Sequence, residues 1–444
     1  MSTLASGPVQ ANRMRAVAVL GLTLALAWGI GTLMSVKDMA TVRAAVVLST
    51  LLVVSLLIFW AAARSDPEGS LLLVVLILSF VFKLVAAYSR FRMGLLADAF
   101  VYDKFGEDIA RTLAAGEWPV MDRYWSTGFV RLVTGMVYLI TGPTLYGATI
   151  LWAWFGLLGM LGFYKAFTVA FPDGNRRLYM ALILLYPSML LWTSSLGKDA
   201  LMVLALGMGA YGAARLHRRL DVPGLWWLAL GVAGMLMVRP HIVGVFVVAL
   251  VASMLVRPIR AGVLSPVIRL AGLAVLVPVA LSLISTAAGF IRLESLTTEG
   301  VLEFVEWAGG QTEQGGSAFA RINPRTPVGF VLGTLTVLFR PFPWEAHTVF
   351  ASMTALEGLG LLALVLLRWR SVKAALLAVR RDSYLVMVLV YGLLFVFFFA
   401  NMANFGIVAR QRVQVYPFVF MLIAYLGGHA SASGRWSAVR THDR

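Results

Sequence analysis

Several charged side chains of this sequence lie at the ends of long apolar runs, and they are of the types that bind phosphate groups. Lys198 and Asp199 are neighbours in "TSSLGKDALM", between two apolar runs. Arg239 lies in "MVRPHI", and Arg410 and Arg412 lie in "VARQRVQVYPF". Arg can bind two phosphate oxygens at once, and Lys adds a compact positive charge. Together these residues predict a phosphate site where the apolar runs end.

Further candidates also have ordinary structural explanations. Arg340 and Glu345 lie in "LFRPFPWEAH", and His241 follows a proline. An Arg at a helix end is most often an anchor, and a His there is most often an interface residue. Glu357 lies about midway in an apolar run, where an acid is costly and by default functional. The alternative for Glu357 is pairing with a buried cation such as Lys83.

A carboxylate that could act as a general base stands at the start of "DAFVYDKFGEDIARTLAAGEW". Asp98 begins this stretch, and Tyr102 and Asp103 are further candidates within it. A carboxylate held beside a hydroxyl group can take its proton as the hydroxyl attacks. The alternative for Asp98 is the N-cap of a helix over 99–115, and Asp199 has the same alternative at its own helix.

A base beside a phosphate site favours one reaction, sugar transfer from a polyprenyl-phosphate donor. The acceptor hydroxyl attacks the anomeric carbon, the carboxylate takes the proton, and Arg and Lys stabilise the charge on the leaving phosphate. A single displacement of this kind inverts the anomeric centre. Whether a divalent metal, Mg²⁺ or Mn²⁺, bridges Asp98 to the phosphate stays open, and no other cofactor is indicated.

The elements that must position these residues are membrane helices. The chain has 444 residues, of which 60% are hydrophobic and 13% are charged, and its mean hydropathy is +0.84. A water-soluble domain of this size could not carry such a composition without aggregating. The net charge of +16 comes mostly from Lys and Arg that flank apolar runs, where they orient helices, so no nucleic-acid partner is expected. The absence of cysteine excludes disulfides and thiolate metal ligands.

The sequence predicts an all-α, polytopic integral membrane protein in which residues 1–444 form a single transmembrane domain. A helical span needs about 20 apolar residues. Twelve runs meet this need, at 16–36, 42–63, 70–88, 143–164, 177–195, 199–216, 223–238, 241–256, 266–290, 348–368, 383–403 and 409–427. Two shorter apolar runs, at 128–141 and 328–339, are expected to dip into the membrane or to lie on it.

Loops rich in Lys and Arg fall on one side of this arrangement, which predicts that both termini are cytoplasmic. The long loops 89–127 and 291–327 then lie outside, and most of the candidate charges lie at the exterior face. Few cations are expected on that face, so these Lys and Arg residues need a role other than orienting helices, such as binding the phosphate of a membrane lipid. The first loop is also predicted to hold an amphipathic helix on the membrane surface. Its apolar face would consist of Tyr102, Phe105, Ile109 and Leu113.

Three stretches resemble the membrane glycosyltransferases of the GT-C fold, which use lipid-phosphate sugars and carry an acidic residue in their first large exterior loop. These stretches are "DAFVYDKFGEDIARTLAAGEW", "YPSMLLWTSSLGKDALMVLALGMGAYGAARL" and "RQRVQVYPFVFMLIA". The resemblance implies that Asp98 is the base of the catalytic loop. It also implies that Lys198, Arg239, Arg410 and Arg412 bind the donor phosphate.

The chain departs from the pattern of this family in two ways. The acidic loop follows the third predicted span, whereas protein mannosyltransferases and aminoarabinose transferases usually carry it after the first. Ala99 also stands where a second carboxylate is usual. The second acidic role is therefore open among Asp103, Asp199 and Glu345.

The expected function is transfer of a hexose or pentose to a glycan or glycolipid acceptor of the cell envelope, in the plasma membrane of a bacterium. The nearest alternative is a polysaccharide polymerase or ligase that acts on polyprenyl-diphosphate glycans, although the net acidic 291–327 loop favours the monosaccharide transferase. A transporter or flippase for lipid-linked substrates is the alternative from another class. It would hold ionisable residues near the bilayer midplane.

Overall fold

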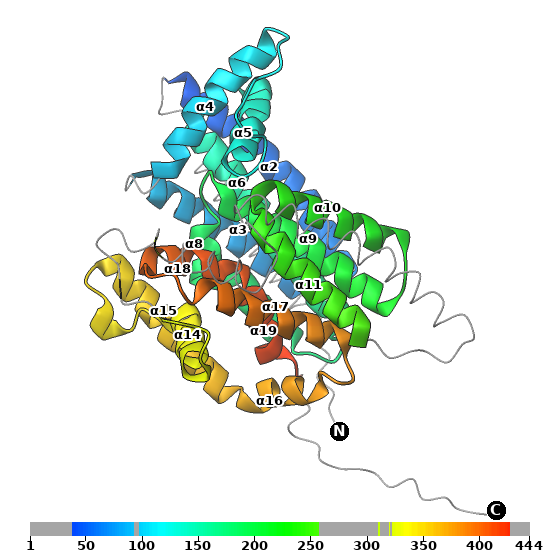
Figure 1. The fold of residues 1–444 in the computed structure, drawn as a ribbon. Helices are drawn as coiled ribbons and strands as arrows, with labels where there is room; N and C mark the ends of the chain where they lie inside the picture. The colour runs from blue at the N-terminus through cyan, green and yellow to red at the C-terminus, as the bar shows by residue number, and fades with distance from the viewer. Residues whose placement is uncertain (1–37, 93–96, 257–309, 311–318, 320–321, 427–444) are drawn as a thin grey trace, which may run out of the picture.

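The computed structural model describes residues 38–92, 97–256, 310, 319 and 322–426, and the elements within them are all helices. Figure 1 shows α4 and α5 at one end of the molecule and α16 at the other. In chain order the helices are α2 (Met39–Arg64), α3 (Gly69–Arg92), α4 (Ala97–Ala114), α5 (Thr127–Thr141), α6 (Leu145–Ala170), α7 (Arg176–Leu185), α8 (Pro187–Trp192), α9 (Lys198–Arg218), α10 (Val222–Val238), α11 (Pro240–Val256), α14 (Pro327–Phe339), η1 (Pro343–Glu345), α15 (Val349–Leu367), α16 (Trp369–Ala378), α17 (Ser383–Phe399), α18 (Phe405–Gln411), η2 (Arg412–Gln414) and α19 (Tyr416–Ala424).

Five of the described helices are long and apolar enough to cross a membrane, namely α2, α3, α6, α9 and α15. The number rises to seven if α16 with α17, and α18 and η2 with α19, each count as one bent span. The all-helical fold and its apolar helices agree with the prediction, but the count of about twelve spans is not confirmed. The predicted spans 16–36 and 266–290, and most of the 291–327 loop, lie outside the described residues.

Several predicted spans are shorter or broken, and the sequence explains the breaks. The span predicted at 177–195 is split into α7 and α8, because Pro187 has no N–H to donate and disfavours the helical conformation at Tyr186. Helices α10 and α11 have 17 residues each, the short end of the spanning range. The span predicted at 409–427 bends by 57° close to Pro417.

Helix α9 is the buried centre of the bundle, packed between α6 and α10. Its backbone approaches both neighbours closely because small residues meet there. A Cβ atom added to Gly207 of α9 would lie 2.1 Å from the carbonyl oxygen of Gly159 in α6. Contacts of this kind hold membrane helices together by van der Waals packing, since lipid provides no hydrophobic force between them. The position of the first residues of α9 is therefore fixed from both sides.

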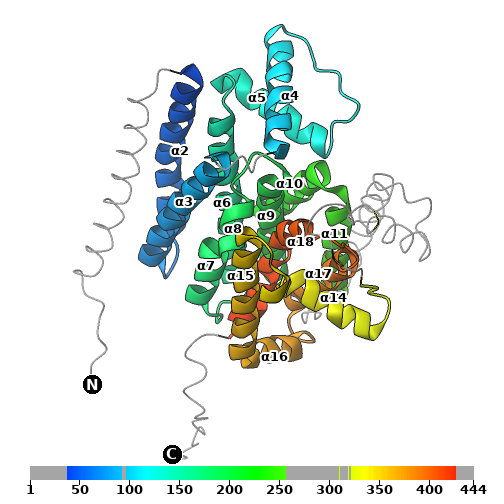
Figure 2. The ribbon, with the colours of Figure 1, turned by 90° about the vertical axis from the view of Figure 1, so that its left-hand side faces the viewer.

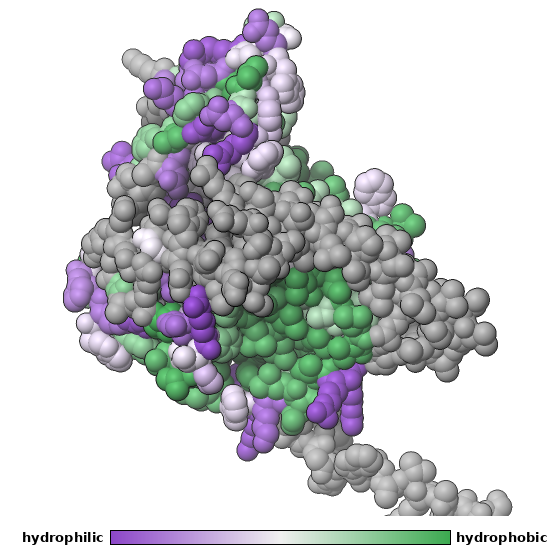
Figure 3. Space-filling model, viewed as in Figure 1, coloured by the Kyte–Doolittle hydropathy of each residue, from purple (hydrophilic) through white to green (hydrophobic). Residues whose placement is uncertain are grey.

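The two ends of α9 lie about one membrane thickness apart. Its 21 residues run from Lys198 to Arg218, a length of about 30 Å, which matches the hydrocarbon core of a bilayer. At the Arg218 end, charged groups from predicted cytoplasmic segments meet, such as Arg177 and Glu68 at 2.9 Å. Figure 3 shows an apolar face between hydrophilic side chains over α4 and α5 and others along the lower edge. The residues that begin α9 thus lie at one polar end of the bundle.

Helices α4 and α5 pack on each other at that end, as Figure 2 shows. Tyr102 of α4 is buried, and an added Cβ at Gly106 would lie 2.5 Å from the side chain of Thr134 in α5. Phe105, which the sequence placed on the apolar face, is 42% exposed, and the guanidinium carbon of Arg131 lies 3.7 Å from its ring centroid. Of the predicted apolar face, Tyr102 therefore packs inside the molecule, whereas Phe105 stays partly exposed.

Candidate functional site

The first two residues of α9 follow a tight turn that joins it to α8. Gly197 is the N-cap residue, so Lys198 and Asp199 lie within the first helical turn, and Asp199 is not the cap. Lys83 of α3 holds this turn by donating to the hydroxyl and carbonyl oxygens of Thr193. The start of α9 is therefore fixed by the turn as well as by its packed faces.

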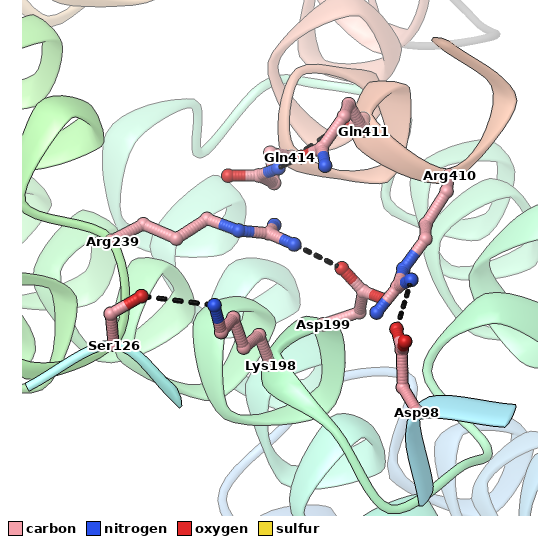
Figure 4. Close-up of polar contacts among 8 residues, drawn as sticks. All are labelled: Asp98, Ser126, Lys198, Asp199, Arg239, Arg410, Gln411 and Gln414. Carbon is pink, nitrogen blue, oxygen red and sulfur yellow. Dashed lines mark hydrogen bonds and ion pairs between the residues drawn. The ribbon is translucent and has the colours of Figure 1, made fainter. Parts of the chain in front are cut away.

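Asp199 is buried and binds two guanidinium groups from different segments. Arg239 donates from Nη2 to Oδ1 at 2.6 Å, and Arg410 donates from Nε to Oδ2. Arg410 also donates from Nη1 to Oδ2 of Asp98 at 2.7 Å (Figure 4). The Asp199 side chain is 6% exposed, whereas that of Asp98 is 59% exposed. Arg410 thus links a buried carboxylate to an exposed one.

Arg239 is positioned by the break between α10 and α11. Pro240 begins α11, and the residue before a proline is pushed out of the helical conformation. Arg239 accordingly has φ −146° and ψ 86°, and its side chain is 7% exposed. In the part of the chain that the structure describes, no group accepts a hydrogen bond from its buried Nη1 atom. A buried donor without an acceptor costs about 1–3 kcal/mol of stability. The Nη1 atom therefore points to an anionic ligand that would accept its hydrogen bond.

Lys198 reaches the loop that joins α4 to α5. Its Nζ atom donates to Oγ of Ser126 at 2.9 Å, as Figure 4 shows. The backbone N–H of Ser126 donates in turn to the carbonyl of Met237 at 2.6 Å. Ser126 has a φ of 58°, a conformation that residues with side chains rarely adopt and that clusters at functional sites. The loop is therefore tied to both α9 and α10.

Lys198, Arg239 and Arg410 line a cavity of about 380 Å³, a size typical of small-ligand sites. Burial and the charge of Asp98 raise the pKa of Tyr102, so its phenol stays protonated at neutral pH and can donate a hydrogen bond. The lining residues come from five separate parts of the chain: Asp98, Val101, Tyr102, Thr127, Lys198, Arg239, Arg410 and Gln411.

Arg90, near the end of α3, adds another positive charge to this site. It interacts electrostatically with Asp98, Asp199 and Arg410. Its guanidinium carbon lies 5.4 Å from the ring centroid of Trp192. Counted over the described residues, four cationic side chains of the site face two carboxylates, which leaves a net charge of +2. Arg90 was not among the predicted site residues, although it too is a cation at a predicted exterior boundary.

Asp103 lies outside this cavity, on the side of α4 that faces α5. Its carboxylate accepts a hydrogen bond from the hydroxyl of Tyr138 in α5, and burial raises its pKa. Asp103 therefore joins the two helices. Of the three candidates for the second acidic role, Asp103, Asp199 and Glu345, Asp199 is the one that binds cations of the cavity.

A separate polar cluster contains the other charged candidates. Arg340 donates from Nε to Oε1 of Glu345 at 2.9 Å. Arg412 is fully buried, donates to the carbonyl oxygen of Arg340 at 3.0 Å and lies 3.9 Å from Oε2 of Glu357. Glu357 also accepts from the backbone N–H and the hydroxyl of Ser188, at 2.7 and 2.6 Å. Because these groups bind one another and do not line the cavity, we leave them out of the phosphate site.

Two further residues from the sequence analysis lie near the site without lining it. His241 is partly buried at the start of α11, close enough to Arg239 and Lys198 for their charges to act on it. Lys83, considered as a partner for Glu357, donates instead to the turn before α9. Lys83 thus supports the turn that carries the first residues of α9.

The carboxylates of the site do not fit a resident divalent cation. Asp98 and Asp199 both accept hydrogen bonds from Arg410, and Asp199 also accepts one from Arg239. A divalent metal would add two positive charges to a site that already carries a surplus, and it would have to displace guanidinium groups from its own ligands. Over the described residues, no group of three or more His, Asp or Glu side chains could hold a metal ion. The arrangement instead favours binding of an anion.

No protein-family model, curated protein or solved structure matches the chain. The resemblance to GT-C glycosyltransferases therefore depends on the sequence stretches quoted above. The chemistry of the cavity must carry the functional conclusion by itself.

Proposed function

We propose that this chain is a membrane-embedded, inverting glycosyltransferase that transfers a sugar from a polyprenyl-phosphate donor to a glycan or glycolipid acceptor. One observation carries the proposal: Lys198, Arg239 and Arg410 converge on a cavity that also holds the exposed carboxylate of Asp98. The cations supply a phosphate site, and the carboxylate supplies a base.

The phosphate of the donor would bind between the two arginines and the lysine. Nη1 of Arg239 is buried and offers a hydrogen bond that a phosphate oxygen can accept. Asp199 holds Arg239 and Arg410 in place, so these side chains lose little conformational entropy when the ligand binds. The site lies where α9 begins, which is the level expected for a lipid headgroup.

The transfer needs one base and one stabilised leaving group. The acceptor oxygen forms a bond to the anomeric carbon while the bond from that carbon to the phosphate oxygen breaks. Asp98 takes the proton of the acceptor hydroxyl, and the electron pair of the broken bond stays on the phosphate. The phosphate thereby gains a second negative charge, while protonation of Asp98 raises the positive surplus of the site from two charges to three. Cations arranged in advance around a developing charge are a large source of catalysis.

The proposed location is the plasma membrane of a bacterium, with both termini in the cytoplasm and the cavity on the exterior face. The basic far end of α9 supports this orientation, because Lys and Arg accumulate on the cytoplasmic side. About twelve spans and a GT-C architecture remain part of the proposal.

A polymerase or ligase for polyprenyl-diphosphate glycans is the second candidate, since the same cations would bind a diphosphate. Its leaving group carries one more negative charge than a monophosphate, but the charge of the described residues does not separate the two donors. We favour the monophosphate donor because the 291–327 loop is net acidic in sequence. For a transporter, Glu357 would need to bind substrate or ions, but its carboxylate is engaged by Ser188 and lies beside Arg412.

The two donor classes can be separated with the purified protein in lipid nanodiscs. Polyprenyl-monophosphate sugars and polyprenyl-diphosphate oligosaccharides would be offered in parallel, each with a cell-envelope extract as acceptor. We expect consumption of a monophosphate donor and a product of inverted anomeric configuration. Consumption of the diphosphate donor alone would replace the proposal with the second candidate.

A further inference from the structure

Arg410 holds two carboxylates that differ sharply in their surroundings. Its Nε atom donates to Asp199, whose side chain is 6% exposed. Its Nη1 atom donates to Asp98 at 2.7 Å, and the Asp98 side chain is 59% exposed. A buried pair is held firmly because breaking it strands a charge, whereas an exposed pair is exchanged at little cost. The contact of Arg410 with Asp199 therefore fixes its position, whereas its contact with Asp98 can be exchanged for another.

The exposed pair engages the carboxylate that is proposed to act as the base. While Oδ2 of Asp98 accepts from Arg410, the carboxylate is held at the guanidinium and only Oδ1 is left to take the proton of an acceptor hydroxyl. The Nη1 atom that donates to Asp98 is also one of the groups that a donor phosphate needs. Phosphate and Asp98 thus compete for the same guanidinium.

We propose that the donor phosphate displaces Asp98 from Arg410, so that the base is released only when the donor is bound. This inference rests on the proposed function and adds an order of events to it. Asp199 keeps Arg410 in place during the exchange, since its contact uses Nε and leaves Nη1 and Nη2 to the phosphate. Asp98, freed beside the bound donor, then accepts the proton of the acceptor hydroxyl. The donor therefore binds before the acceptor is activated.

Competition predicts the sign of a binding change. Asp98→Asn removes the charge that competes for Arg410 and that repels the phosphate, so the variant should bind a polyprenyl monophosphate about three- to tenfold more tightly than the wild type. A metal that bridged Asp98 to the phosphate would give the opposite sign, because the variant would lose a ligand of that metal.

The probe is radiolabelled farnesyl phosphate, with inorganic phosphate as a second probe, bound to the full-length protein in nanodiscs. Asp108→Asn is the matched control, because Asp108 lies on the same helix, is exposed and contacts Arg111 instead of Arg410. Tighter binding of farnesyl phosphate by Asp98→Asn, with Asp108→Asn unchanged, supports the exchange. Equal tightening for inorganic phosphate would show that the phosphate alone drives it; tightening for farnesyl phosphate only would assign the lipid as the required ligand.

The remaining outcomes separate this inference from the proposed function. Unchanged or weaker binding by Asp98→Asn, in a wild type that does bind, overturns the exchange and leaves the phosphate site intact. Absence of binding by the wild type and by Asp98→Asn overturns both. A second measurement adds Arg410→Gln, in which the gain from Asp98→Asn should shrink, because only the lost repulsion between Asp98 and the phosphate still contributes. A gain of the same size without Arg410 would also overturn the exchange.

Discussion

Replacing Asp199 with Asn should destabilise the protein far more than replacing Asp98 with Asn, although both carboxylates bind Arg410. The Asp199 side chain is 6% exposed and accepts from two guanidinium groups, one of them at 2.6 Å. An amide carries no charge, so the buried Arg239 would lose its counter-ion. Breaking a buried pair in this way costs about 3–5 kcal/mol. The Asp98 side chain is 59% exposed, and an exposed pair contributes only about 0.2–1 kcal/mol.

The free energy of unfolding can be measured by titrating detergent-solubilised protein with SDS, at a fixed lipid content for the wild type and both variants. We expect a loss of about 3–5 kcal/mol for Asp199→Asn and of less than about 1 kcal/mol for Asp98→Asn. The double variant Asp199→Leu with Arg239→Met should recover part of the first loss, because it removes both charges of that buried pair. Equal losses for the two Asn variants would show that burial does not decide the strength of these contacts.

Three further changes have defined outcomes. Gly207→Leu should lower the unfolding free energy by about 3 kcal/mol or more, since a Cβ there would lie 2.1 Å from a carbonyl of α6, whereas Gly360→Leu, where a Cβ meets open space, should change it little. A buried cation is costly, so Lys83→Met should leave the unfolding free energy unchanged or raise it. The same variant should weaken farnesyl phosphate binding, because the turn before α9 loses the hydrogen bonds from Lys83. Unaltered binding would contradict a positioning role for Lys83. Burial raises the pKa of the Glu345 carboxyl, but the hydrogen bonds from Arg340 and from the backbone N–H of Phe342, together with the charge of Arg340, lower it overall. Stability should therefore fall as the pH drops below about 4.5, and Glu345→Gln should flatten that fall.

The residues of the site could be predicted from the sequence where they broke a rule of membrane topology. Lys198, Arg239 and Arg410 are cations on the predicted exterior side, where few are expected, and the structure brings all three to one cavity. Arg340 and Arg412 broke the same rule but bind acids and carbonyls of their own cluster. Sequence position alone could not separate the two groups, because the difference is which acids the fold places beside each arginine.

Other residues of the site, and one helix break, could not be predicted from a single sequence. Ser126, Thr127 and Gln411 are small or neutral polar residues in loops and helix ends, where such residues are ordinary. The break between α7 and α8 was signalled by Pro187, but an apolar run around a proline also fits one kinked span. Tertiary contacts decide these cases, and hydropathy does not record them.

The most direct test of the central claim is transfer of radiolabelled sugar from a polyprenyl-phosphate donor by the purified protein in nanodiscs, with cell-envelope acceptors. Wild type, Asp98→Asn and Asp103→Asn would be compared, since both acids lie on α4 but Asp103 bonds to Tyr138 outside the cavity. We expect transfer by the wild type and by Asp103→Asn, and loss of transfer in Asp98→Asn while the donor still binds. Full transfer by Asp98→Asn, or no consumption of a monophosphate donor by the wild type, would contradict it.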